Sequence, residues 1–243
     1  MATKINEALK ISEEKLEREG IFNGFVDIDS KFYVDPHLLE FSTIQEFAEG
    51  YKAFKKHFED IVKLLDATKD INDRFFREAV KRLIFKEIPY LGLGYAKNDV
   101  SGSGIGEEIA KNLAKTAMQI IEEGIKDPTF FELVGLIEKN IGPDRISDMT
   151  TKIIQKNIIE YNQRKARELG LKTKNVKFRQ DNYSVPYNTF TGRIIFLLPK
   201  SILRNLPIAH DWSEVDFVAA QNQALRNKVN KIIGNTWKDA TKK

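Results

Sequence analysis

The sequence predicts a mainly α-helical fold of the α+β class, and three observations favour this class. Over residues 43–65 apolar side chains recur every three or four positions, which is the period of one face of an α-helix. The same spacing recurs in later stretches that are bounded by glycine, proline or capping residues. Only two short segments, near residues 24–35 and 191–198, have the composition of β-strands. We therefore expect a helical domain with a few short strands.

The helical pattern predicts an ordered series of helices along the chain. They cover residues 5–19, 43–65, 73 to 85 or 87, 107–123, 128–140 and a stretch that starts at 144 or 147 and ends near 169. Residues 200–206 could form one or two helical turns, and residues 212–237 a helix or a pair of helices. Thr43 and Glu46 have the spacing of a capping box at the start of the second helix. Gly20, Gly124 and Gly170 follow the ends of three others, where glycine readily adopts the left-handed conformation that closes a helix.

The two strand-like segments differ in character. Residues 24–35 place apolar side chains on both sides of a polar tip at 29–31, which predicts a hairpin or a bent pair of short strands. Residues 194–198 form a continuous apolar run between Gly192 and Pro199, which predicts a buried strand.

Charge is divided unequally along the chain. Residues 1–150 carry 21 Lys and Arg against 28 Asp and Glu, whereas residues 151–243 carry 18 against 7. A strongly basic segment is typical of proteins that bind a polyanion, most often nucleic acid. We expect an acidic helical domain over residues 1–170 and a basic segment over residues 171–243. That segment, with its one buried strand and closing helix, should pack on the first part.

The composition also excludes several classes of protein. Cysteine is absent, which excludes disulfides, thiolate metal sites and a cysteine nucleophile, and three histidines argue against a histidine-rich zinc site. No stretch approaches the ~20 apolar residues that cross a bilayer. The charged N-terminal residues lack the apolar core of a secretory signal. We expect a cytoplasmic protein with no membrane partner.

Two aspartates in the segment 142–148 are candidate metal ligands. Asp144 and Asp148 are four residues apart, so on a helix they share one face at about 6 Å between Cβ atoms. Carboxylate oxygens are the ligands that Mg²⁺ and Mn²⁺ prefer. Both acids also have a structural interpretation, because acids at the start of a helix cap it and interact with its dipole.

Further acids could complete such a site. Asp35 shares one face of the strand-like segment with Asp27 and Asp29 if that strand is unbroken, and carboxylates on strands commonly hold the cations of phosphodiester chemistry. Glu87 has apolar neighbours and precedes Pro89. Turn formation and ion pairing at a helix end are the structural alternatives.

A basic stretch over residues 164–179 is the main candidate for nucleic-acid binding. Aromatic residues near it, namely Tyr161, Phe178, Tyr183 and Tyr187, could stack on bases. A solvated helix face that continues into a loop explains the same charges. The candidate phosphate-binding side chains are Arg164, Lys165, Arg167, Lys172, Lys174, Lys177, Arg179 and Lys200.

A glycine-rich segment over residues 102–106 precedes a predicted helix. Backbone N–H groups of Gly104 and Gly106 at that helix start could hold a phosphate. The segment lacks the lysine of a P-loop and the spacing of the dinucleotide motif, and two glutamates follow it directly. A simple turn into the helix is the alternative.

Four segments, residues 32–39, 142–148, 198–204 and 222–230, resemble a group of bacterial proteins found in mobile-element or anti-phage defence settings. The resemblance covers most of the chain but carries no agreed activity, so it transfers no catalytic residue. Members of the group tend to be longer. The resemblance therefore implies an N-terminal fragment of a longer protein, with a downstream domain or partner.

These observations lead to two main hypotheses of function. The first is a nucleic-acid-engaging protein, in its sharpest form a Mg²⁺- or Mn²⁺-dependent phosphodiester hydrolase. In that form Asp144, Asp148 and one of Asp35 or Glu87 hold the cation. The second is a non-catalytic sensor or assembly module that acts through a protein subunit or self-association, which oppositely charged halves would favour. A nucleotide binder that uses residues 102–106 ranks third.

Overall fold

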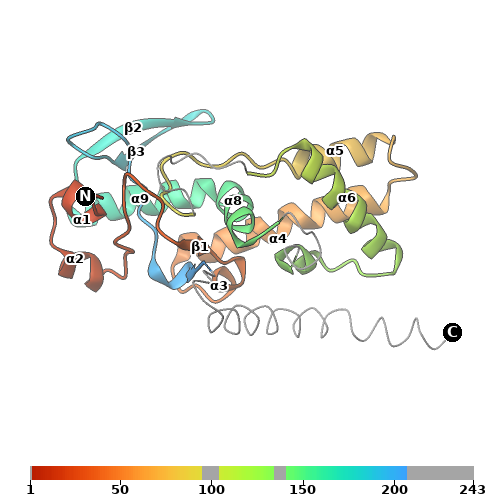
Figure 1. The fold of residues 1–243 in the computed structure, drawn as a ribbon, viewed down its shortest axis with the longest axis horizontal. Helices are drawn as coiled ribbons and strands as arrows, with labels where there is room; N and C mark the ends of the chain where they lie inside the picture. Colours follow the sequence, from red (N-terminus) through yellow and green to blue (C-terminus); the bar gives the residue numbers. More distant parts are fainter. Residues whose placement is uncertain (1, 95–103, 134–140, 207–243) are drawn as a thin grey trace.

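The computed structural model describes residues 2–94, 104–133 and 141–206, and these form an elongated molecule (Figure 1). It is mainly helical with two small antiparallel sheets, which confirms the predicted fold class. The α-helices are α1 (Ile5–Leu9), α2 (Glu13–Arg18), α3 (Pro36–Glu40), α4 (Gln45–Asp66), α5 (Arg74–Arg82), α6 (Glu107–Glu122), α8 (Pro143–Ile153) and α9 (Gln155–Leu169). Two 3₁₀ helices, η1 (Pro128–Leu133) and η2 (Lys200–Ile202), complete the helical elements of the described ranges.

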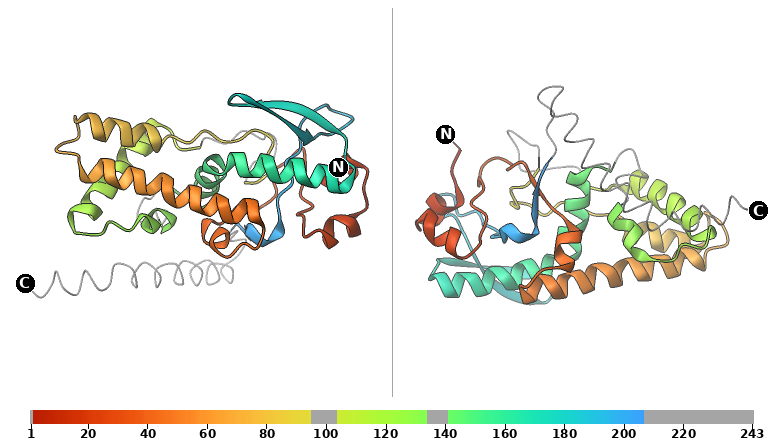
Figure 2. Two further views of the ribbon diagram at one scale, coloured as in Figure 1. Left: turned by 180° about the vertical axis from the view of Figure 1, so that it is seen from behind. Right: turned by 90° about the horizontal axis from the view of Figure 1, so that it is seen from below.

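Two helices predicted as single elements are each divided. Residues 5–19 form α1 and α2, because Lys10 adopts a left-handed conformation (φ 57°) and Ser12 caps α2 by accepting a hydrogen bond from the Lys15 N–H. Residues 144–169 form α8 and α9, which meet at Ile154. In Figure 2, α4 and α9 lie nearly end to end along the molecule and α8 rises from the region where they meet.

The predicted capping box at the start of α4 does not form. Ile44 is the N-cap residue, and its side chain makes no capping hydrogen bond. The Glu46 carboxylate instead accepts two hydrogen bonds from the Arg164 guanidinium of α9, at 2.6 and 3.0 Å. A bidentate ion pair is stronger than a bond to a helix N–H, so the tertiary partner takes the carboxylate.

Both sheets are two-stranded. β1 (Phe32–Val34) pairs with β4 (Leu203–Asn205), with Phe32 opposite Asn205. β2 (Thr173–Phe178) pairs with β3 (Asp181–Pro186) as a hairpin that packs on α9. The segment 24–35 therefore contributes one strand, and its partner comes from the basic part of the chain.

The apolar run 194–198 is buried but forms no regular strand. Ile194 forms an isolated bridge with Tyr187, the Ile195 N–H donates to the Pro186 carbonyl at 2.9 Å, and the Leu198 carbonyl accepts from the Phe22 N–H at 2.9 Å. The side chain of Asn162 on α9 also holds the run, because that amide accepts from the Leu197 N–H at 2.7 Å and donates to the Leu197 carbonyl at 2.9 Å.

The core consists of two hydrophobic clusters. The first cluster joins α1, α2, β1, α3 and α9 with residues 195–202, and the second joins most of α4 with α5, α6 and η1. Helix α8 lies between them, since Met149 belongs to the second cluster and the adjoining Ile154 to the first. The first part of the basic segment thus packs on the acidic part through β4 and the run 195–198.

Some sequence predictions fall outside the described residues. These are the closing helix over 212–237, the second half of the helix predicted over 128–140, and residues 102 and 103 of the glycine-rich segment. Among the described helices, none combines the length and the apolar character that crossing a bilayer requires.

Candidate active site at a cluster of carboxylates

The start of α8 carries the two aspartates that the sequence singled out. Gly142 is its N-cap residue and Pro143 occupies the first turn, where a proline needs no hydrogen-bond partner for its nitrogen. Asp144 lies in that first turn, and Asp148 follows one turn later. The buried Ser147 fixes the helix, because its hydroxyl accepts a 3.0 Å hydrogen bond from the Val34 N–H of β1.

Asp148 is surrounded by other carboxylates. Burial and, after it, the negative charges of Asp144, Glu87 and Asp29 together raise its pKa to about 7, while Arg145 acts in the opposite direction. Burial also raises the pKa of Asp144. The charges of three of these acids act on the fourth, and we call the four together the carboxylate cluster.

Asp29 reaches the carboxylate cluster from the loop before β1. The adjoining Ser30 exchanges backbone hydrogen bonds with Gly92 and Gly94, at 2.9 and 3.1 Å, which ties this loop to residues 91–94. A Cβ atom at Gly94 would lie 2.7 Å from the Asp29 Oδ2 atom and 3.1 Å from the Asp144 Oδ1 atom. The two carboxylate oxygens therefore approach residue 94 so closely that only a glycine fits there.

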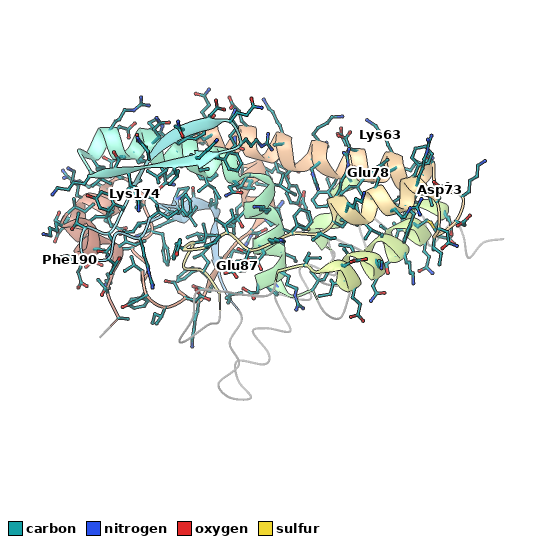
Figure 3. All side chains as sticks on the ribbon, turned by 90° about the horizontal axis from the view of Figure 1, so that it is seen from above. Lys63, Asp73, Glu78, Glu87, Lys174 and Phe190 are labelled. Carbon is teal, nitrogen blue, oxygen red and sulfur yellow. The ribbon has the colours of Figure 1, made fainter. Side chains whose placement is uncertain are left out.

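Glu87 enters from a third segment, after α5. Phe85 pairs with Ile105 through two backbone hydrogen bonds of 2.8 and 3.0 Å, and this pairing positions the chain that leads to Glu87. Figure 3 shows Glu87 in the middle of the molecule, near α8. The Arg145 Nε–H donates to the Gly104 carbonyl at 3.1 Å, so the same paired segment also holds the arginine.

Positive side chains accompany the acids. Lys152 lies one turn after Asp148 on α8, and its pKa is lowered by desolvation and by the charge of Lys86, the neighbour of Glu87. The Lys152 ammonium donates to the Gln155 side chain at 3.0 Å, and Arg145 is the cation whose charge acts on Asp148. Such a mixture can bind a divalent cation through the acids and a phosphate through the bases.

The described residues do not hold a finished metal site. In the ranges 2–94, 104–133 and 141–206, no three acidic or histidine side chains lie together in a way that could hold a metal ion. The donor chemistry nevertheless fits a hard cation, because the carboxylate cluster offers oxygen ligands only. Carboxylates of like charge repel one another, and a bound divalent cation would relieve that repulsion and draw them together.

Asp35 has different partners from those that a metal site requires. One carboxylate oxygen accepts a 2.9 Å hydrogen bond from the His37 N–H and so caps α3. The other is paired with Arg204 of β4. The structural interpretation thus accounts for both oxygens, and Asp29 is the residue of this segment that joins the carboxylate cluster.

The predicted phosphate-binding cations fall into two groups. Arg164 and Lys165 are bound within the fold: Arg164 pairs with Glu46 and Glu168, and Lys165, which is 9% exposed, pairs with Glu19 and Glu168. Lys200 is paired with Glu17. The others are exposed on α9 and the β2–β3 hairpin, and they are Arg167, Lys172, Lys174, Lys177 and Arg179.

The two glycines of the predicted phosphate loop have distinct roles. Gly104 is buried with φ +54°, and a Cβ there would lie 2.3 Å from the Phe85 carbonyl oxygen, so close backbone packing requires a glycine. Gly106 is exposed and is the N-cap residue of α6, without a side-chain cap. Phosphate binding at this helix start stays a prediction.

Sequence reasoning missed the contribution of two residues to this site. It grouped Asp29 with Asp27 and Asp35 on one strand face, and it gave Arg145 no part in the site. The signal for both lies in contacts between segments distant in the chain, namely Ser30 with Gly92 and Arg145 with Gly104. No local spacing encodes such contacts.

Comparison with protein families assigns the chain. Residues 10–211 match the model of the family described as Domain of unknown function (DUF8370). The chain belongs to this family. The match spans the carboxylate cluster, both sheets, the second hydrophobic cluster and all of the first except its residues on α1. No curated protein and no solved structure matches the chain.

Proposed function

We propose that this DUF8370 protein is a Mg²⁺- or Mn²⁺-dependent phosphodiester hydrolase that acts on nucleic acid. The observation that supports the proposal is the convergence of Asp29, Glu87, Asp144 and Asp148 from three separate segments at the junction of the two hydrophobic clusters. A fold gains no stability from gathering like charges in a half-buried place, so such a cluster is typical of a functional site.

Each residue of the cluster would have a definite task. Asp29 and Asp144, whose carboxylate oxygens both approach Gly94, would hold a cation. A divalent cation bound there would activate water and stabilise negative charge on the scissile phosphate. Asp148, whose pKa is about 7, can accept or release a proton near neutral pH. Arg145, whose charge acts on Asp148, would orient the phosphate.

The basic segment supports a polyanionic substrate. Exposed cations on α9 and the β2–β3 hairpin would attract a nucleic-acid backbone in a salt-sensitive, sequence-independent way. Following the resemblance to proteins of mobile-element and anti-phage defence settings, we propose that the protein acts in the cytoplasm in such a setting.

A cleavage assay tests the proposal. The full-length protein is incubated with single-stranded DNA, plasmid and RNA, with Mn²⁺, with Mg²⁺ or with EDTA. We expect cleavage that requires the cation and falls by two orders of magnitude or more in Asp144→Asn and Asp148→Asn, as about 10²–10⁴-fold effects are usual for such groups. Glu122→Gln, an exposed acid on α6, is the matched control and should retain full activity.

The assay also separates the two hypotheses of function. Binding of nucleic acid without any cleavage would contradict the hydrolase and favour the non-catalytic module. Cleavage that survives in both aspartate variants would show that the carboxylate cluster is not the active site. Circular dichroism of each variant verifies that the fold is retained.

A further inference from the structure

We propose that single-stranded nucleic acid binds to a strip of exposed aromatic and cationic side chains, and that this strip leads to the carboxylate cluster. The aromatic strip consists of Lys10, Phe190, Arg193 and Tyr90. The inference rests on the proposed function only where it states that the strip leads to the carboxylate cluster. The binding itself is argued from the exposure and the contacts of these four residues.

Two exposed aromatic rings provide the first observation. Within the described ranges four large apolar side chains are strongly exposed, and they are Phe41, Ile71, Tyr90 and Phe190. Phe190 is the most exposed of them, at 73%, and Tyr90 is 41% exposed. An exposed ring forgoes the free energy that burial would give, so a ring held in solvent is available to a ligand.

Each of these rings is paired with a cation. The Lys10 ammonium lies 4.6 Å from the centroid of Phe190, and the Arg193 guanidinium lies 5.9 Å from that of Tyr90. Phe190 and Arg193 belong to one loop, so the four residues form a continuous strip. A ring beside a cation is the combination that binds single strands, because a base stacks on the ring and its phosphate meets the charge.

The loop that carries Phe190 is held rigidly from within. Asn188 is 5% exposed, and its side-chain oxygen accepts hydrogen bonds from the N–H groups of Phe190 and Thr191, at 2.9 and 3.3 Å. Its backbone N–H donates to the Arg193 carbonyl at 2.8 Å, which closes the loop. The buried amide thus presents Phe190 at the loop tip without relying on the ring for packing.

Tyr90 connects the aromatic strip to the proposed active site. It lies in the segment that runs from Glu87, a member of the carboxylate cluster, to Gly94, which Asp29 and Asp144 of that cluster approach. Its backbone is left-handed (φ 68°), which is uncommon for a tyrosine. A strand stacked on Tyr90 would therefore have its next phosphates beside the carboxylates.

The surroundings of the strip favour a polyanion. Lys174 of β2 donates to the Gly192 carbonyl at 3.4 Å, which places its ammonium beside the Phe190 loop. Figure 3 shows Lys174 and Phe190 at the same end of the molecule. Bases in a duplex are already stacked on one another, so isolated rings of this kind select single strands over duplexes.

Binding of a fluorescently labelled single-stranded oligonucleotide, measured by anisotropy in EDTA, tests the inference without cleavage. Phe190→Leu and Tyr90→Leu should each weaken binding roughly tenfold, because base stacking is lost. Phe190→Trp, which keeps an aromatic ring at this position, should bind with the affinity of the wild type. Phe41→Leu is the matched control, since that ring is 66% exposed near the end of α3 and should not affect binding. Lys10→Gln with Arg193→Gln should flatten the salt dependence.

The outcomes of this experiment and of the cleavage assay are independent. Unchanged affinity in Phe190→Leu and Tyr90→Leu, equal affinity for a duplex, or no binding by the wild type would each overturn the aromatic strip. Binding through the strip without cation-dependent cleavage would leave the strip intact and contradict the hydrolase. Cation-dependent cleavage together with unchanged affinity in the ring variants would support the hydrolase and contradict the aromatic strip.

Discussion

A single buried amide, that of Asn162, helps to hold the apolar run 194–198. Its side chain makes three hydrogen bonds, donating to the Ile158 and Leu197 carbonyls and accepting from the Leu197 N–H. The side chain is fully buried on α9. The sequence predicts the burial of this run from its composition, but the polar partner lies 35 residues away and no local pattern identifies it.

Replacing Asn162 should destabilise the protein strongly. In Asn162→Ala the Leu197 backbone groups lose their partners inside the first hydrophobic cluster, which costs about 2–4 kcal/mol in the free energy of unfolding. Urea unfolding followed by circular dichroism measures this. Asn182→Ala, at an exposed position of β3, should change the free energy by less than about 0.5 kcal/mol. Equal effects in the two variants would contradict the role given to Asn162.

Asp148 should make stability depend on pH. Its pKa rises from near 4 in the unfolded chain to about 7 in the folded protein. The folded state thus holds the proton more tightly, so the free energy of unfolding should fall as pH rises between these values. Asp148→Asn removes this penalty and should stabilise the protein at about pH 8 by roughly 2–4 kcal/mol, with no gain near pH 4. Thermal unfolding across this range provides the measurement, and a gain that does not depend on pH would disprove the assignment.

The approach of the two carboxylates to Gly94 can be tested with one methyl group. Gly94→Ala would bring a Cβ to 2.7 Å from the Asp29 carboxylate. The backbone of residue 94 also has a positive φ of 137°, which disfavours alanine. We expect Mn²⁺ affinity to fall roughly 10–100-fold, as when groups that orient metal ligands are disturbed. Gly106→Ala meets no atom within 4 Å and serves as the control. Isothermal titration of both variants with Mn²⁺ would reveal equal affinities if the site lies elsewhere.

At the scale of elements, the junction of α4 and α9 depends on an ion pair that sequence analysis interpreted differently. Arg164 belongs to a basic stretch and was predicted to contact phosphate, yet it pairs with Glu46, 118 residues earlier. The bond from Arg164 lowers the pKa of Glu46. This contribution to stability is therefore present above the unfolded pKa of the glutamate and is lost as the pH falls through its lower folded value.

Arg164→Gln should separate folding from nucleic-acid binding. It leaves Glu46 without its partner at a half-buried junction and should lower the free energy of unfolding by about 1–2 kcal/mol. The effect is no larger because the arginine is partly exposed and solvent screens its charge. Affinity for single-stranded DNA should not change. Lys177→Gln, on an exposed strand position, should have the opposite profile, with a weaker salt dependence and unchanged stability. If Arg164→Gln weakens DNA binding at constant stability, the ion pair is not its main role.

The sequence predicts the existence of the elements better than their ends and partners. The long amphipathic pattern of α4 and that of α6 are local properties, so their bounds agree with prediction to within two residues. The breaks at Lys10 and Ile154 have no glycine or proline to mark them. The pairing of β1 with β4 joins residues near the two ends of the described chain, and three-residue strands carry too little pattern to predict it.

At the scale of the whole molecule, the carboxylate cluster lies where the two hydrophobic clusters meet. Its acids come from the loop before β1, from the segment after α5 and from α8, so the site depends on how both clusters pack against α8. The sequence could indicate Asp144, Asp148 and Glu87 from their spacing and surroundings. It could not indicate Asp29, because that residue reaches the site only through the pairing of Ser30 with residues 92–94.

Equilibrium titration of the full-length protein with Mn²⁺ at about pH 8, above the pKa of Asp148, tests the central claim most directly. The account predicts saturable binding that raises the midpoint of thermal unfolding and is lost in the variant carrying Asp144→Asn and Asp148→Asn, but is retained in Glu122→Gln. Saturable binding that persists in the double aspartate variant, or no saturable binding by the wild type, would contradict it.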